Sequence, residues 1–142
     1  MKTETKPLPT WLIVLSSVLI AFNLLIFGAL TFFNPTLTFP DAGAGGIFPT
    51  QFMAIRHIAF ALPLLHGTVR RDPKILITMY TIFFVMAVLD VVTLAANGYY
   101  IPLVVSLVGE LPLIATALLS AGMFILPMGY TLYYLRTNHN VH

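Results

Sequence analysis

Long apolar stretches separated by short polar segments make up most of the chain. One runs from Trp11 to Phe33, and others cover about residues 50–69 and 75–96. A helix needs about 20 mainly apolar residues to cross a hydrocarbon core of about 30 Å, and each stretch is that long. The apolar positions are continuous and do not alternate with polar ones, which disfavours a β-barrel. The pattern therefore predicts transmembrane helices.

The segments between these stretches predict turns and loops. Residues 34–49 contain three prolines and the run Gly43–Gly46, which predicts a loop that breaks any helix. The charged segment Arg70–Lys74 predicts a tight turn, and Asn97-Gly98 is a helix-stop signal. The first stretch is too long for a secretory signal and lacks a small-residue cleavage site, so we expect it to be retained as a helix.

The last apolar segment, residues 102–135, is too long for one straight span. As a single helix it would measure about 51 Å. Pro112 and Pro127 interrupt it. We therefore expect the last helix to be kinked or broken near Pro112, with the fourth span at about residues 111–135.

Composition places the chain among membrane proteins. Of its 142 residues, 58% are hydrophobic and 8% are charged, whereas soluble domains carry roughly 25% charged residues. The mean hydropathy is +0.92. The net charge of +2 is too small and too scattered for nucleic-acid binding. The sequence thus predicts an all-α protein: a single transmembrane domain over residues 1–142, built as an integral membrane four-helix bundle.

The basic residues predict how this bundle is oriented. All but one of the seven Lys and Arg residues lie before the first helix, between the second and third, or after the fourth. They are Lys2, Lys6, Arg70, Arg71, Lys74 and Arg136. With four spans, these three places lie on the same side of the membrane, and basic loops favour the cytoplasm. We therefore expect both termini to be cytoplasmic.

Polar residues inside the spans predict a site in the outer half of the membrane. The seventh basic residue, Arg56, and the acid Asp90 each lie about 9 Å from the outer ends of their helices at 1.5 Å per residue. Glu110 falls about 12 Å deep and Asn23 about 15 Å deep on the same count. His57 follows Arg56 and is rotated from it by 100°. Charges at this depth are costly and usually have a partner and a function.

Several interpretations of these residues stay open. Arg56 and Asp90 could form a buried structural ion pair that fixes the register of two helices. The same pair could instead belong to a binding or catalytic pocket, or contact a partner subunit. Glu110 favours a pocket. The positive charge of Arg56 neutralises only one carboxylate, so a second buried acid needs another partner. The ligand-binding candidates are Asn23, Arg56, His57, Asp90 and Glu110, with Asp90 and Glu110 as the catalytic candidates.

The histidines and the lack of cysteine argue against a metal site. The chain has no cysteine, which excludes thiolate ligands and disulfides. His57 and His66 are nine residues apart and therefore point to opposite faces of the second helix. No other predicted span carries a histidine. We expect no metal, haem or other cofactor in a single chain.

Three features together resemble a known family. The stretch Gln51–Leu65 with its intramembrane arginine, the basic turn Arg70–Lys74, and the run Val85–Asp90 are similar to the small four-helix DoxX-like membrane proteins of bacteria. The resemblance covers residues 50–98 by sequence and the rest by hydropathy. It implies a four-helix bundle in the cytoplasmic (inner) membrane of a bacterium. Some DoxX-like chains are subunits of membrane oxidoreductases that handle quinone.

Three functional hypotheses follow. The first is a multi-pass membrane protein that binds a small or lipid-like ligand in an outer-half polar pocket, or serves as an accessory subunit of a membrane complex. The second is an intramembrane enzyme that uses acid–base chemistry on an apolar, isoprenoid or quinone-like substrate, with Asp90 or Glu110 moving the proton and Arg56 stabilising negative charge. The third, a proton-coupled transporter working as a dimer, is disfavoured because the charge bias is strong and single-signed. The expected partners are the lipid bilayer, a second copy of the chain or a larger membrane complex.

Overall fold

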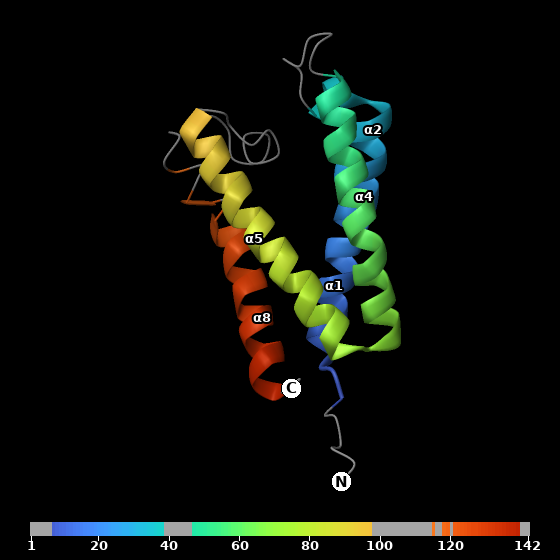
Figure 1. The fold of residues 1–142 in the computed structure, drawn as a ribbon, viewed down its shortest axis with the longest axis vertical. Coiled ribbons are helices and arrows are strands. Elements are labelled where there is room, and N and C mark those ends of the chain that lie inside the picture. Colours follow the sequence, from blue (N-terminus) through green and yellow to red (C-terminus); the bar gives the residue numbers. More distant parts are fainter. Residues whose placement is uncertain (1–6, 39–46, 98–114, 116–117, 120, 140–142) are drawn as a thin grey trace. The chain divides into compact units, whose positions relative to one another are not determined.

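The computed structural model describes residues 7–38, 47–97, 115, 118–119 and 121–139 (Figure 1). Every regular element in these residues is helical. They form four long helical stretches, over residues 10–33, 47–70, 73–97 and 121–138. The chain divides into two compact units, Met1–Leu76 and Ile77–His142, and each is described by itself.

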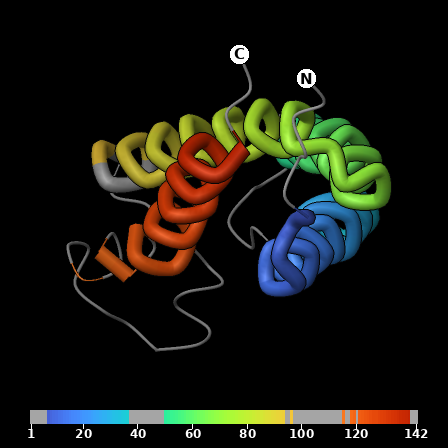
Figure 2. The backbone as a smooth tube through the Cα atoms, turned by 90° about the horizontal axis from the view of Figure 1, so that it is seen from below, coloured from blue at the N-terminus to red at the C-terminus, as the bar shows by residue number. Residues whose placement is uncertain are grey.

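Unit 1 is built on two long helical stretches that lie side by side. The first consists of α1 (Thr10–Ala21), the π-helix η1 (Phe22–Leu30) and the short α2 (Thr31–Phe33), which follow one another without a break. The second is α4 (Ile47–Arg70). All three segments of the first stretch contact α4. Figure 1 shows them from blue to cyan beside the green α4, and Figure 2 shows the same pair from below.

Each helix of this pair buries one narrow face. Leu12, Ser16 and Ile20 are buried at four-residue intervals on α1, and Ala54, Ala61 and Leu64 are buried on α4. The remaining faces stay apolar: Val18, Leu25, Ile55, Leu62 and Val69 are among their exposed side chains. A helix that is apolar on every side is typical of a membrane span. Consistent with this, the helices Thr10–Phe33, Thr50–Arg70 and Pro73–Thr93 are long and apolar enough to cross a membrane.

A tight turn links α4 to the next helix. The Arg71 N–H donates to the Thr68 carbonyl at 3.2 Å, and the Asp72 N–H donates to the Gly67 carbonyl at 2.9 Å. These two bonds form the usual two-bond ending of an α-helix, which places the residue after the helix in the left-handed region. Arg71 occupies that position with φ 52°. The position normally favours glycine, because a Cβ atom is strained there.

The helix α5 (Pro73–Asn97) begins directly after this turn. The Asp72 carboxylate accepts hydrogen bonds from the N–H groups of Lys74, at 2.9 Å, and Ile75, at 3.4 Å. An aspartate before the helix and a proline at its first position are a favourable start, because the first N–H groups have no partner within the helix.

Unit 2 contains the remainder of α5, the π-helix η2 (Ala121–Ile125) and α8 (Leu126–Asn138). Met128, Thr131 and Leu135 form the buried face of α8. A Cβ atom on Gly129 would lie 3.1 Å from the Phe84 ring, so α8 packs closely on α5 at this glycine.

The predicted spans agree with the described helices. The predicted stretches 11–33, 50–69 and 75–96 correspond to helices over residues 10–33, 47–70 and 73–97. The all-helical fold is confirmed for the described residues. In the fourth span, helix covers residues 121–138, three residues beyond the predicted end at Leu135. The predicted break near Pro112 lies outside the described residues.

The prediction that residues 34–49 contain no helix was wrong in part. Pro35–Thr38 forms a short helix, α3, and α4 begins at Ile47. Both errors have the same physical cause. A proline breaks the interior of a helix but fits its first turn, where its missing N–H would have no partner and its fixed φ is already helical. Pro35 and Pro49 both lie in a first turn.

Candidate functional site

The middle of the first long helical stretch, residues 10–33, has an unusual backbone. Residues Phe22–Leu30 form a π-helix, with wider turns than an α-helix. Such segments are rare and usually one turn long, and they often occur at functional sites. At its end, the Ile26 carbonyl accepts hydrogen bonds from both the backbone N–H and the Oγ1 of Thr31, the latter at 3.0 Å. Thr31 is fully buried, so this closing contact is enclosed by the fold.

Gly28 allows α4 to approach this π-helix. A Cβ atom at Gly28 would lie 2.6 Å from Ile58 Cγ1 on α4 and 2.7 Å from the Asn23 carbonyl oxygen of its own helix. Both distances are far shorter than van der Waals contact. Only a residue without a side chain fits here, as at the close helix crossings of membrane proteins.

A hydrogen bond joins the two helices beside this glycine. Asn23 Oδ1 lies 2.8 Å from His57 Nδ1, and Asn23 Nδ2 donates to the Leu19 carbonyl at 2.8 Å. The second bond fixes the orientation of the amide, because only its nitrogen can donate to a carbonyl. The Oδ1 atom therefore faces the imidazole as an acceptor, and His57 Nδ1 must carry the proton that it donates. Asn23 is buried, with 6% of its surface exposed.

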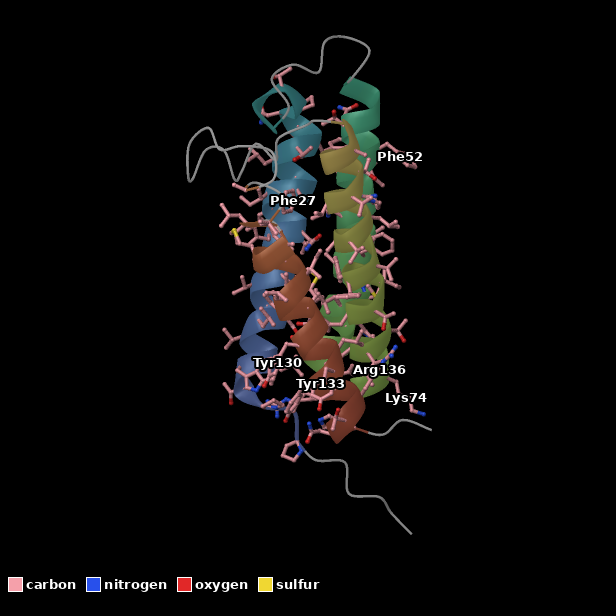
Figure 3. All side chains as sticks on the ribbon, turned by 90° about the vertical axis from the view of Figure 1, so that its left-hand side faces the viewer. Phe27, Phe52, Lys74, Tyr130, Tyr133 and Arg136 are labelled. Carbon is pink, nitrogen blue, oxygen red and sulfur yellow. The ribbon has the colours of Figure 1, made fainter. Side chains whose placement is uncertain are left out.

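An aromatic ring fixes the plane of the imidazole. The rings of Phe27 and His57 are stacked, with centroids 5.1 Å apart and planes 27° apart. Figure 3 marks Phe27 on the first span. Asn23 and Phe27 both belong to η1, so one π-helical turn supplies the hydrogen bond and the stacking contact that orient His57.

The remaining ring nitrogen, His57 Nε2, is the atom of this imidazole that can accept a further hydrogen bond. Asn23 is the one hydrogen-bond partner of His57 among the described residues. Because Nδ1 carries a proton, Nε2 of the neutral ring has a lone pair and accepts hydrogen bonds. The side chain is half-buried. Its Nε2 atom is therefore oriented for a further partner.

The structure brings together some of the residues predicted from sequence. Asn23 and His57 are in direct contact, and the half-buried Arg56 precedes His57 on α4, with its Nε atom enclosed. Asp90 lies on α5 in unit 2, and Glu110 lies outside the described residues. The Arg56–Asp90 pair and the roles of both acids therefore stay predictions.

Four residues that shape the site around His57 were not predicted from the sequence. Phe27 and Gly28 lie in η1, Thr31 follows its last residue, and Gln51 Nε2 on α4 donates to the Phe32 carbonyl at 3.2 Å. One signal was available: Gly28 is the single glycine of an otherwise bulky apolar span, five residues after its buried asparagine.

Metal coordination has no support in the described residues. Within them, no group of three or more His, Asp or Glu side chains converges as metal ligands would. No family model, curated protein or solved structure matches the chain.

Proposed function

We propose that this chain is a multi-pass protein of a bacterial cytoplasmic membrane, with both termini in the cytoplasm, that binds a small lipid-like molecule at His57. Its three long apolar helices and the one-sided placement of its basic residues support the membrane location and the orientation. The resemblance of residues 50–98 to DoxX-like proteins supports a bacterial origin and a four-helix bundle.

The observation that carries the binding proposal is the fixed orientation of His57. A structural hydrogen bond between two spans needs only the Asn23–His57 contact. The stacked Phe27 ring adds a second constraint on the imidazole, and it leaves Nε2 without a partner among the described residues. A polar atom in apolar surroundings costs free energy unless it is hydrogen-bonded. A ligand hydroxyl that donates to Nε2 would remove this cost.

The surroundings of His57 indicate the chemistry of the ligand. Nε2 of the neutral ring accepts a hydrogen bond. A ligand that donates this hydrogen bond carries a hydroxyl group on an apolar body. The exposed apolar faces of α1 and α4 would contact that body within the bilayer. A lipid-like molecule has this combination.

Unit 1 favours binding over acid–base catalysis. Asp72 is the one carboxylate among its described residues, and it caps the start of α5. The polar pair Asn23–His57 therefore provides hydrogen-bonding groups without an acid beside it in this unit. The catalytic roles predicted for Asp90 and Glu110 need evidence of their own.

Native mass spectrometry of the full-length protein, released from gentle detergent, tests the proposal. We expect wild-type protein to retain a small molecule that His57→Leu and Asn23→Leu lose. His66→Leu is the matched control, because His66 is an exposed histidine of the same helix. Circular dichroism would verify that each variant is folded. Equal retention by His57→Leu and His66→Leu, or no adduct on wild-type protein, would contradict the proposal. The same spectra report the number of subunits.

A further inference from the structure

The turn between α4 and α5 carries an arginine that its backbone does not favour. Arg71 has φ 52°, in the left-handed region, at the helix-ending position where glycine is the usual residue. Glycine would form the same two hydrogen bonds to Thr68 and Gly67 without steric strain. The backbone of the turn therefore gives no reason for an arginine. A strained residue of this kind points to a use for its side chain.

Arg71 is part of a small cationic cluster, which we define as Arg70, Arg71 and Lys74. All three side chains are exposed. Lys74 extends away from the ribbon in Figure 3. Arg70 and Arg71 make no ion pair with a described residue. The acid of the turn, Asp72, directs its Oδ1 to the first N–H groups of α5, so the cluster holds three cations against one carboxylate.

The position of the cluster relative to the apolar helices indicates which class of molecule it meets. Both helices that the turn joins are long and apolar enough to span a membrane, so the turn lies at a membrane surface whichever side that is. Val69, directly before the cluster, is 72% exposed. An apolar side chain followed by cations matches the boundary between acyl chains and headgroups. Anionic lipids attract juxtamembrane Lys and Arg residues at this level.

We propose that the Arg70–Arg71–Lys74 cluster binds the phosphate headgroup of an anionic phospholipid. The planar guanidinium of Arg71 can donate two parallel hydrogen bonds to phosphate oxygens, which a lysine cannot do. The left-handed backbone holds this guanidinium on the turn, between Arg70 and the start of α5. This site is separate from His57 and does not depend on a ligand there.

Lipid retention by the full-length protein tests this proposal. Wild-type protein would be reconstituted in nanodiscs of phosphatidylcholine with or without phosphatidylglycerol, released, and measured by native mass spectrometry. We expect retained phosphatidylglycerol to fall about fivefold in Arg71→Gly and about thirtyfold in Arg70→Gln/Arg71→Gln, since each basic residue that contacts the anionic headgroup contributes about a fivefold factor. Arg136→Gln, at an exposed arginine in the last turn of α8, is the matched control and should retain it like wild type.

The Arg71→Gly variant removes the positive charge of residue 71 without destabilising the turn. Because glycine relieves the left-handed strain, this variant should melt at the same temperature as wild type or higher in phosphatidylcholine alone, while it loses the stabilisation that phosphatidylglycerol gives to wild type. Wild-type retention by Arg71→Gly or by the double variant would overturn the proposal. So would an equal rise in melting temperature on adding inorganic phosphate to protein in phosphatidylcholine, since the ligand would then be free phosphate. His57→Leu should keep its phosphatidylglycerol, which distinguishes this site from the one proposed above.

Discussion

The two π-helices among the described residues differ in how their residues pack. In unit 1, η1 encloses Asn23 and Gly28 and provides the contacts that orient His57 on α4. In unit 2, η2 (Ala121–Ile125) has no buried residue, and a Cβ atom at its Gly122 would meet nothing within 4 Å. The same widened backbone thus encloses buried residues in one unit and only partly covered residues in the other.

The residues next to η2 in the sequence account for its π-helical backbone, whereas those in and around η1 do not account for its own. Pro127 lies two residues after the end of η2 and has no N–H for the Met123 carbonyl, which disturbs the α-helical bonding of this turn. The span from Trp11 to Phe33 contains no proline. Its π-helix is instead accompanied by contacts with α4 and by the Thr31 hydroxyl bond to the Ile26 carbonyl. One π-helix of the described residues is thus accompanied by tertiary contacts, and the other by a nearby proline.

The largest expected effect on stability comes from adding one methyl group at Gly28, inside η1. Gly28→Ala should lower the free energy of unfolding by about 1–3 kcal/mol, as overpacking does elsewhere. The new Cβ atom would lie 2.6 Å from Ile58 Cγ1 and 2.7 Å from the Asn23 carbonyl, and a backbone atom of the same turn has little freedom to move away. Denaturant unfolding in detergent, followed by circular dichroism, measures this change.

Gly122→Ala is the matched control for this substitution. It adds the same methyl group in open space, so we expect a gain of about 0.5–1 kcal/mol from the reduced flexibility of the unfolded chain. Equal effects at the two glycines would show that packing does not distinguish the two π-helices.

A double-mutant cycle on the Asn23–His57 contact should give the next largest effect. We expect Asn23→Leu and His57→Leu each to destabilise the protein, with a coupling energy of about 0.6–1.7 kcal/mol, the range for hydrogen bonds between membrane helices. The cycle uses the same unfolding measurement. A coupling energy near zero would mean that the contact forms without stabilising the helix pair, and that η1 is maintained by apolar packing alone.

The spans could be predicted from sequence because hydropathy is a sum over many residues. The boundaries at 11–33, 50–69 and 75–96 lie within three residues of the described helix ends. Depth counting also predicted Asn23 and Arg56, the neighbour of His57, in the outer half of the membrane. The direct contact between them could not be predicted, because depth fixes the level of a side chain and not its direction around the helix. The π-helix changes that direction after Asn23, and Gly28 was the one sequence signal of this turn.

The aromatic residues of η1 allow a smaller test within a single π-helix. Phe27→Leu removes the ring that stacks on His57, so we expect a loss of about 0.5–1.5 kcal/mol together with weaker retention of the proposed ligand. Phe22→Leu is the control, because Phe22 starts the same π-helix with 41% of its surface exposed. Similar losses in the two variants would indicate that general hydrophobicity matters here and not the contact with His57.

The smallest change in stability, with a clear change in backbone, is expected for Pro127→Ala. Alanine restores the N–H that the Met123 carbonyl lacks, so η2 should convert to α-helix. The restored hydrogen bond is offset by the greater flexibility that alanine gives the unfolded chain, so the free energy of unfolding should change by less than about 0.5 kcal/mol. Hydrogen–deuterium exchange of the peptide covering residues 121–126 should slow, because α-helical hydrogen bonds have better geometry than π-helical ones. Exchange over residues 22–30 should not change, since contacts with α4 and not a proline accompany that π-helix. Unaltered exchange in residues 121–126 would show that Pro127 is not the cause of η2, and the two π-helices would then share a tertiary origin.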